Sequence, residues 1–284
     1  MPLLITVGCM ITGVIQGIFK KQYNLKCQGG QITFCTSSSL FALFFFIIIT
    51  PDIHFGFRIV PYSVLFAIVY SAAIVFNILA IQIGSFALTT LVLSYSLIIP
   101  TVYGLLYLNE KIDVIKIAGI LSLLLSLILI RQKVTANDQK KVSFRWVIYL
   151  IIGFITNGAC SVVQNEQRRA FHNVENGNFM ILSLCMCFLL LTIVSVLMER
   201  KWLRMSLQKG IMTAALCGIS NGATNWLVMV AISMISASVF FPILSAGQMI
   251  LTYLISVLFY HEKFIPRQKI GMVFGMLSLI LLNL

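Results

Sequence analysis

Neutral amide and aromatic side chains stand inside the long apolar stretches of this 284-residue sequence. Asn221 and Asn225 are four residues apart, so in a helix they share one face beside Trp226. Amides both donate and accept hydrogen bonds, which suits binding of a small polar solute. The alternative is that they hold neighbouring helices together, because an unpartnered amide is costly in an apolar medium. The candidate substrate-binding residues are Gln16, Asn77, Tyr95, Gln164, Asn221, Asn225, Trp226 and Gln248.

A second group of candidates carries charge. Lys20 and Lys21 follow the first apolar stretch, and Glu166 and Arg168 follow the sixth. We predict that these side chains lie at the mouths of a cavity, where a cation attracts an anionic or zwitterionic solute. The alternative is that they are anchors, whose long alkyl chains reach from an apolar stretch to the surface.

Groups suited to catalysis or metal binding are missing from the interior of the apolar stretches. All eight acidic residues and all three histidines fall at the ends of the stretches or between them. The sequence also lacks a nucleophile motif and the spacing of a metal site. We therefore expect no enzyme activity, no catalytic residue, no metal and no cofactor.

The composition indicates a protein that crosses the lipid bilayer many times. Hydrophobic residues make up 60% of the chain, charged residues 10%, and the mean hydropathy is +1.00. The net charge of +12 does not indicate nucleic-acid binding, because the Lys and Arg residues stand in short connections, where they set orientation in the membrane. The seven cysteines lack the spacing of a disulfide framework or a zinc site.

The apolar parts of the sequence form ten stretches, each about long enough to cross a bilayer. Five stretches per half is an odd number, so the second half must enter the membrane inverted relative to the first. We predict one five-helix repeat over 1–130, a linker over 131–144 and a second repeat over 145–284. The predicted spans are 2–19, 32–49, 61–82, 86–107, 114–130, 145–164, 178–198, 210–232, 235–258 and 267–283.

Similarity between the halves supports the repeat. The segment LNEKI, with Glu110 and Lys111, matches YHEKF, with Glu262 and Lys263, and Gly119 then matches Gly271. A second offset aligns Gln16 with Gln164, Asn77 with Asn225, and the pair Lys20 and Lys21 with Arg168 and Arg169.

This pattern resembles the drug/metabolite transporter superfamily, and within it the EamA-like ten-helix members, whose repeats carry a Glu between the fourth and fifth helices. The resemblance implies that helices one, three, four, six, eight and nine surround the substrate. Pro100 matches a family position and is expected to kink the fourth span. The motif marks a fold family and does not identify a substrate.

The distribution of positive charge predicts the orientation in the membrane. Fifteen of the 20 Lys and Arg residues fall on one side of the predicted topology. By the positive-inside rule that side is cytoplasmic, which places both termini outside, whereas many relatives are drawn with both termini inside.

The sequence thus predicts an all-α membrane protein with ten transmembrane helices in two inverted five-helix repeats. We expect a transporter of a small polar organic metabolite, amino-acid-like or similar, that works by alternating access in the cell membrane as a monomer or homodimer. The alternative is a lipid flippase or scramblase whose polar groove opens sideways to the bilayer.

Overall fold

The structure is a computed structural model that describes residues 2–27, 29–54, 56–97, 99–100, 144–171, 175–234, 237–262 and 264–281, and isolated positions between 103 and 129. Within these ranges the chain forms nine α-helices and no strand. The α-helices are α1 (Pro2–Lys26), α2 (Gln31–Ile49), α3 (Val60–Ile83), α4 (Phe86–Ser94), α7 (Phe144–Phe171), α8 (Asn176–Met198), α9 (Leu203–Met234), α10 (Ala237–Leu258) and α11 (Pro266–Leu281). Two short 3-10 helices are η1 (Phe57–Ile59) and η2 (Tyr95–Leu97).

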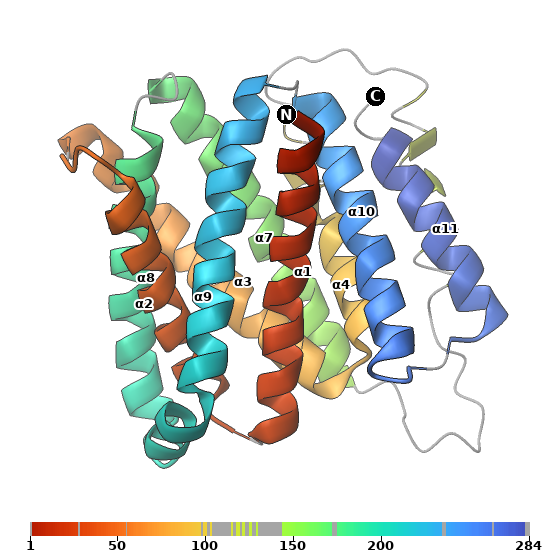
Figure 1. Cartoon of the computed structure of the whole chain (residues 1–284), viewed down its shortest axis with the longest axis horizontal. Helices are drawn as coiled ribbons and strands as arrows, with labels where there is room; N and C mark the ends of the chain where they lie inside the picture. The colour runs from red at the N-terminus through yellow and green to blue at the C-terminus, as the bar shows by residue number, and fades with distance from the viewer. Residues whose placement is uncertain are drawn as a thin grey trace.

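The helices form a bundle, and successive helices from α1 to α4 and from α7 to α11 run in opposite directions (Figure 1). We call the end where α1 ends and α2 begins the lower end, and the opposite end the upper end. The connections α3–α4, α8–α9 and α10–α11 lie at the lower end. Helices α1 and α7 run in opposite directions across the bundle.

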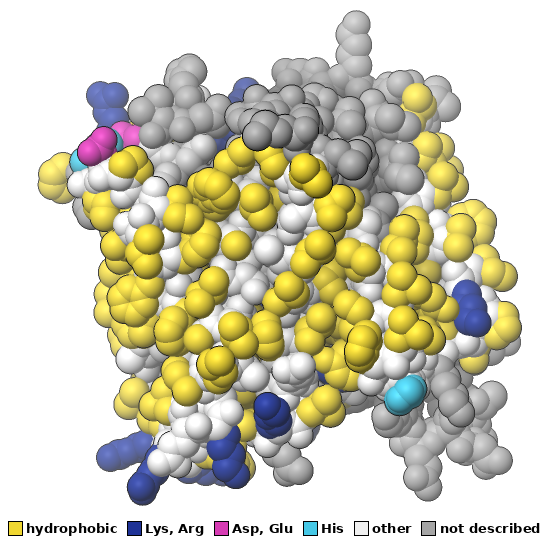
Figure 2. Space-filling model, viewed as in Figure 1, with side chains coloured by type: hydrophobic (Ala, Val, Ile, Leu, Met, Phe, Trp, Pro, Cys, Tyr) yellow, Lys and Arg dark blue, Asp and Glu magenta, His cyan; other side chains and the backbone are white. Residues whose placement is uncertain are grey.

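The surface of the bundle fits a membrane. Five of the described helices are long and apolar enough to cross a bilayer, by length and composition: Leu4–Lys26, Gln31–Ile49, Phe57–Ile83, Phe144–Phe171 and Asn176–Met198. Hydrophobic side chains cover the middle of the face in Figure 2, whereas Lys and Arg gather at its lower end. Helices satisfy their own backbone hydrogen bonds, as the interior of a bilayer demands. The chain is an all-α membrane protein.

The two halves of the chain are interleaved. Helix α1 packs mainly against α9, α2 against α9 and α8, and α3 against α7, so helices from the first half contact helices from the second. Two connected apolar cores fill the side of the bundle formed by α2, α3, α8 and α9, with Phe46, Phe66 and Phe179 in one and Phe34 in the other. Residues from both halves thus face the interior together.

Two helices extend well beyond their predicted ends. Helix α1 reaches Lys26 instead of residue 19, and α7 reaches Phe171 instead of residue 164. Lys20 and Glu166 are therefore helical residues, not residues of a connection. Helix α9 likewise begins at Leu203, seven residues before its predicted start. Polar residues continue these helices because a helix end outside the apolar region needs no apolar sequence, only backbone hydrogen bonds.

Helix α4 changes geometry before Pro100. Its α-helical hydrogen bonding ends at Ser94 and passes into η2. Proline has no N–H to donate to the carbonyl four residues earlier, here that of Ser96, and its ring crowds that carbonyl. The backbone at Ser96 is buried and lies close to α7, where a Cβ on Gly158 would stand 2.7 Å from the Ser96 oxygen. The chain thus forms a local 3-10 turn before Pro100, and α7 packs on this turn.

Candidate functional site

Asn221 on α9 is the centre of a hydrogen-bond network that joins three helices. Its Nδ2 donates to Oε1 of Gln16 on α1 at 3.0 Å, and its Oδ1 accepts from the Tyr70 hydroxyl on α3 at 2.8 Å. Asn225, one turn later, donates to the Asn221 backbone oxygen at 2.9 Å and to its Oδ1 at 3.3 Å. The i, i+4 spacing in the sequence therefore places both Asn side chains in one network.

Two threonines extend this network along α1 and α9. Gln16 Nε2 donates to Thr224 Oγ1 at 3.0 Å, and the Thr224 hydroxyl lies 2.8 Å from Thr12 Oγ1. Both the oxygen and the nitrogen of the Gln16 side-chain amide thus form hydrogen bonds. The network satisfies buried amides in the way an apolar surrounding requires, and it also fixes how α1 and α9 face each other.

A small polar cavity adjoins the network. Its volume is about 10 Å³, roughly the room of one water molecule, whereas pockets for small organic ligands measure about 300–1,000 Å³. The helices around this cavity must therefore separate before an organic solute can enter. We call it the polar cavity; its lining residues are Gln16, Lys20, Phe34, Cys35, Ser38, Ser39, Tyr70, Ile74, Cys217 and Asn221.

The other predicted substrate-binding residues lie outside this cavity. Asn77 on α3 keeps its Oδ1 buried, and this oxygen has no hydrogen-bond partner within the described part of the chain. Gln248 on α10 donates to the Cys9 carbonyl at 3.2 Å, tight against Gly13. Tyr95 is fully buried, and its hydroxyl bonds to Ser126, whose Oγ donates to the Gly271 carbonyl at 2.6 Å.

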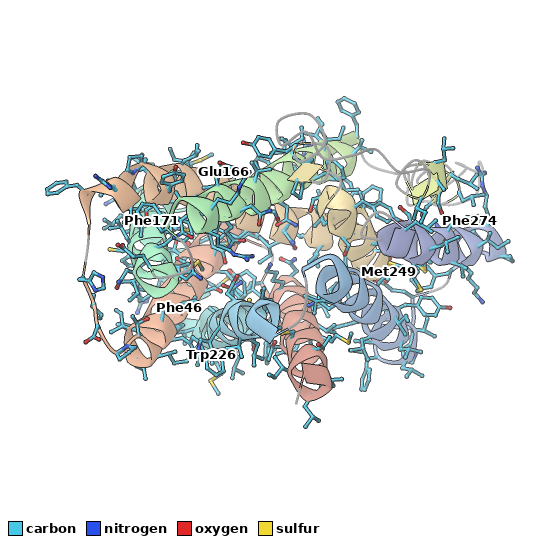
Figure 3. All side chains as sticks on the ribbon, turned by 90° about the horizontal axis from the view of Figure 1, so that it is seen from above. Phe46, Glu166, Phe171, Trp226, Met249 and Phe274 are labelled. Atoms are coloured by element: carbon cyan, nitrogen blue, oxygen red, sulfur yellow. The ribbon has the colours of Figure 1, made fainter. Side chains whose placement is uncertain are left out.

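Trp226 and Gln164 are also placed apart from the amide network. Trp226 is 39% exposed and lines a separate cleft at the upper end together with Phe46, beside which it lies in Figure 3. Gln164 lies on α7 and makes no side-chain hydrogen bond within the described part of the chain. The bundle brings together Gln16, Asn221 and Asn225 out of the eight predicted residues.

The upper cleft is larger than the polar cavity. It has a volume of about 580 Å³ and lies between the end of α2, the start of α8 and the upper part of α9. On its rim, Asn178 Nδ2 lies 3.3 Å from His54 Nδ1, and its Oδ1 accepts from the His54 backbone N–H at 3.3 Å. The lining residues are Phe46, Ile49, Thr50, Pro51, Asp52, His54, Asn176, Gly177, Asn178, Trp226 and Val230.

Some residues of the network and of the cavity lining were not predicted from the sequence. Thr12 stands four residues before Gln16, and Lys20, one of the predicted mouth charges, stands four residues after it, so helical spacing alone places all three on one face. Ser38 and Ser39 interrupt an otherwise apolar stretch of α2. Such short hydroxyl side chains bond easily to their own helix, as Ser39 does to the Thr36 carbonyl at 2.8 Å, which is why they gave no signal of a site.

The four charged residues predicted at the mouths of a cavity lie in different surroundings. Lys20 is half-buried and lines the polar cavity, and it makes no ion pair with any residue of the described ranges. Lys21 turns instead to Glu262 in the α10–α11 connection, at 3.4 Å. Glu166 pairs with Arg169 at 3.5 Å on the exposed upper part of α7. Arg168 lies beside them on α7 and is half-buried.

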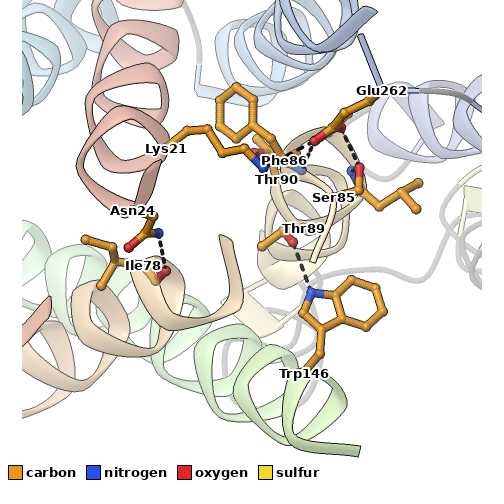
Figure 4. A network of polar contacts seen from close by, with 11 residues as sticks. Lys21, Asn24, Ile78, Ser85, Phe86, Thr89, Thr90, Trp146 and Glu262 are labelled. Atoms are coloured by element: carbon orange, nitrogen blue, oxygen red, sulfur yellow. Dashed lines mark hydrogen bonds and ion pairs between the residues drawn. The ribbon is translucent and has the colours of Figure 1, made fainter. Parts of the chain in front are cut away.

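Glu262 caps a helix of the other half of the chain. Its carboxylate accepts from the Phe86 backbone N–H at 2.9 Å and from the Ser85 hydroxyl at 2.7 Å, at the start of α4 (Figure 4). The fold thus brings a carboxylate of the α10–α11 connection to the start of α4. The predicted repeat mate of Glu262 is Glu110, which lies outside the described residues.

The same contact holds α1 at the lower end. The Lys21 ammonium lies 5.7 Å from the centre of the Tyr260 ring. Burial, and then the charge of Glu262, raise the pKa of Tyr260 above its usual value. The face of this aromatic ring attracts the ammonium. We call Lys21, Ser85, Tyr260 and Glu262 the lower cluster. It links α1 and α4 of the first half with the α10–α11 connection of the second.

Comparisons with known proteins also indicate to which class of protein this chain belongs. Residues 144–284 match the model of the EamA-like transporter family. No curated protein matches the chain. A solved structure described as "Crystal structure of protein" has a TM-score of 0.62 and 12% identity, and the match covers 99% of this chain and 95% of that chain, which shows a shared fold. Through the half that the family model matches, the chain belongs to the EamA-like transporter family, part of the drug/metabolite transporter superfamily, and is a membrane transporter of that type.

Proposed function

We propose that this chain carries a small polar organic solute across the membrane by alternating access. The observation that carries the proposal is the Asn221 network beside the polar cavity, which brings amides and hydroxyls of α1, α3 and α9 to one place. The cavity has room for about one water molecule, so a solute must enter through another arrangement of the helices. A site that changes its access in this way is what a carrier needs.

We further propose that the ten predicted spans form two inverted repeats that move against each other. The opposite directions of α1 and α7 support this arrangement, since the repeat relates these two helices. At the lower end, the lower cluster holds α1, α4 and the α10–α11 connection together. In this proposal the lower cluster separates when the carrier opens to the lower side and forms again when it opens to the upper side.

The proposed solute is an amino-acid-like or similar metabolite that moves by facilitated diffusion or exchange in the cell membrane. None of the described residues that line the polar cavity is a carboxylate, which is the group that proton coupling or an organic cation usually requires. Glu166 is paired with Arg169 on the exposed part of α7 and does not line the cavity. Amides, hydroxyls and aromatic rings suit a polar solute that is neutral, zwitterionic or anionic.

Purified protein provides the test. Water-soluble metabolites are screened for a rise in melting temperature in detergent, and each metabolite that stabilises the protein is then measured by counterflow in liposomes. We expect stabilisation and counterflow by the same solute, and counterflow that persists when the pH gradient is collapsed. Glu166→Gln serves as the control and keeps most of the activity. Counterflow that strictly requires the proton gradient and is lost in this variant contradicts the proposed energetics.

The same screen distinguishes a carrier of soluble metabolites from a lipid flippase or scramblase. The upper cleft has an apolar wall with Phe46 and Trp226, and its rim carries Asp52 and His54. If only a phospholipid or polyprenyl lipid stabilises the protein, and substitution of Trp226 by Ala removes that effect, the solute-carrier proposal fails. A metabolite that is carried while Trp226→Ala has no influence on it supports the polar cavity as the site.

A further inference from the structure

Lys20 lies deeper in the bundle than its sequence suggests. It stands six residues before the end of α1, which corresponds to about 9 Å along the helix axis. It follows Gln16 by one turn, and both line the polar cavity together with Tyr70 and Asn221. The positive charge thus belongs to the same surface as the amide network.

Lys20 and Lys21 are neighbours in sequence but have different partners. Successive residues of a helix point about 100° apart, so only one of the two can face the lower cluster. Lys21 does so and pairs with Glu262. Lys20 faces the cavity, and among the lining residues that the structure describes it is the only charged one.

The two described carboxylates at the lower end, those of Glu199 and Glu262, already have other partners. Glu262 binds Lys21, Ser85 and the backbone of α4. Glu199, at the end of α8, accepts from the backbone N–H of Thr33 at 2.9 Å and from its hydroxyl at 3.1 Å. Nowhere in the described ranges does a carboxylate form an ion pair with Lys20. The ammonium therefore faces a polar cavity without a counter-charge from those residues.

We propose that Lys20 binds the carboxylate of the transported solute. The inference rests on the proposed function and narrows the solute to a small monocarboxylate, including a zwitterion such as an amino acid. An ammonium has three donors and no acceptor, and its attraction to an oxyanion strengthens in a site away from water. One cation balances one carboxylate, whereas a phosphate monoester brings nearly two negative charges.

The neighbouring side chains complete the site for such a solute. The Ser38 and Ser39 hydroxyls and the Tyr70 and Asn221 side chains line the cavity beside Lys20 and can bond to the rest of the solute once the helices separate. On α3, Tyr70, Ile74 and Asn77 follow i, i+4, i+7 spacing and share a face. Asn77 lies outside the present cavity, but its Oδ1 has no hydrogen-bond partner among the described residues and can serve as an acceptor for an amine or hydroxyl group once the helices separate.

Matched probes test the charge requirement. The melting temperature of the purified protein is measured with the proteinogenic L-amino acids, lactate and pyruvate, and with the corresponding carboxamide of each, at constant ionic strength. We expect at least one acid to stabilise the wild type while its carboxamide does not. Lys20→Gln should weaken that binding by about tenfold or more, and Lys20→Arg should retain part of it. Lys26→Gln, on the exposed last turn of α1, should bind like the wild type.

The unliganded variants separate binding from folding. Because Lys20 has no counter-charge among the described residues, Lys20→Gln alone should melt at the wild-type temperature or above it. A lower melting temperature that Lys20→Arg restores indicates a structural ion pair and overturns the proposal.

Two further results also overturn it: equal stabilisation by acid and carboxamide, or no stabilisation by any acid in the panel. If carboxamides bind and undergo counterflow, the carrier function stands and only the assignment of Lys20 fails. If neither acids nor carboxamides bind or move, both proposals fail.

Discussion

The Glu262 carboxylate, between α10 and α11, lies 3.4 Å from the ammonium of Lys21 on α1, 241 residues away in the sequence. Both side chains are largely buried, with 15% and 16% of their surface exposed. The same carboxylate accepts from backbone N–H groups at the start of α4, where the helix dipole favours an anion. One side chain thus connects three segments that do not follow one another in the chain.

The first prediction concerns this carboxylate. Glu262→Gln removes the anion from the start of α4 and the ion pair with Lys21, and we expect a loss of about 1 to 2 kcal/mol in stability, since the site is partly buried. The melting temperature in detergent measures the effect. Glu166→Gln is the matched control, because its partner Arg169 is exposed and such pairs contribute little. Equal melting of the two variants would show that the lower cluster does not stabilise this state.

The second prediction separates binding from packing in the amide residues. Asn221→Leu leaves Gln16 Oε1 and the Tyr70 hydroxyl without their partner, which costs about 1–3 kcal/mol for each buried group. Asn77→Leu removes an oxygen that has no partner among the described residues, so it should melt no lower than the wild type. Both variants should lose counterflow of the wild-type solute. Normal transport by Asn77→Leu would exclude Asn77 from the site.

The third prediction concerns the close approach of α2 and α9. A Cβ on Gly218 would lie 2.2 Å from the Ser38 backbone oxygen, which cannot move without shifting α2. Gly218→Ala should therefore destabilise the protein by roughly 1–3 kcal/mol, even though Ala favours a helix. Gly8→Ala is the control, because its nearest neighbour, Leu227 Cδ1, would lie at an ordinary 3.5 Å. Thermal melting of both variants measures the difference, and a stable Gly218→Ala would mean that the two helices can separate freely.

The fourth prediction concerns orientation. If the positive lower end faces the cytoplasm, a cysteine at Lys201 should resist impermeant thiol reagents in intact cells, and a cysteine at Asp52 should react. A reporter fused after Leu284 should lie outside the cytoplasm. Six of the seven native cysteines are buried, so wild-type labelling gives a low background. Rapid labelling of the cysteine at position 201, with protection of the cysteine at position 52, would show that the orientation is the opposite of the predicted one. The corresponding expectation for Lys140 falls outside the described residues.

Local patterns predicted the helices well. The turn between α3 and α4 occupies Gly84 and Ser85, where the break between two apolar stretches of the sequence predicts it. The ends of α1 and α7 were placed seven residues too early, because hydropathy reports where a helix leaves the apolar region and not where its hydrogen bonds stop. Helical spacing likewise joined Asn221 to Asn225, since i and i+4 share a face in any helix.

The sequence by itself determined that this protein is a bundle of apolar membrane helices with neutral amides inside them, because length, hydropathy and helical spacing are local properties. Tertiary structure decided which polar groups meet. It joins Gln16 to Asn221 across 205 residues, separates Trp226 from the amides, and gives Lys21 a carboxylate while Lys20 faces the cavity. The sequence of two adjacent lysines does not specify such different surroundings, because the partner of each lysine depends on which helices pack on each face of α1.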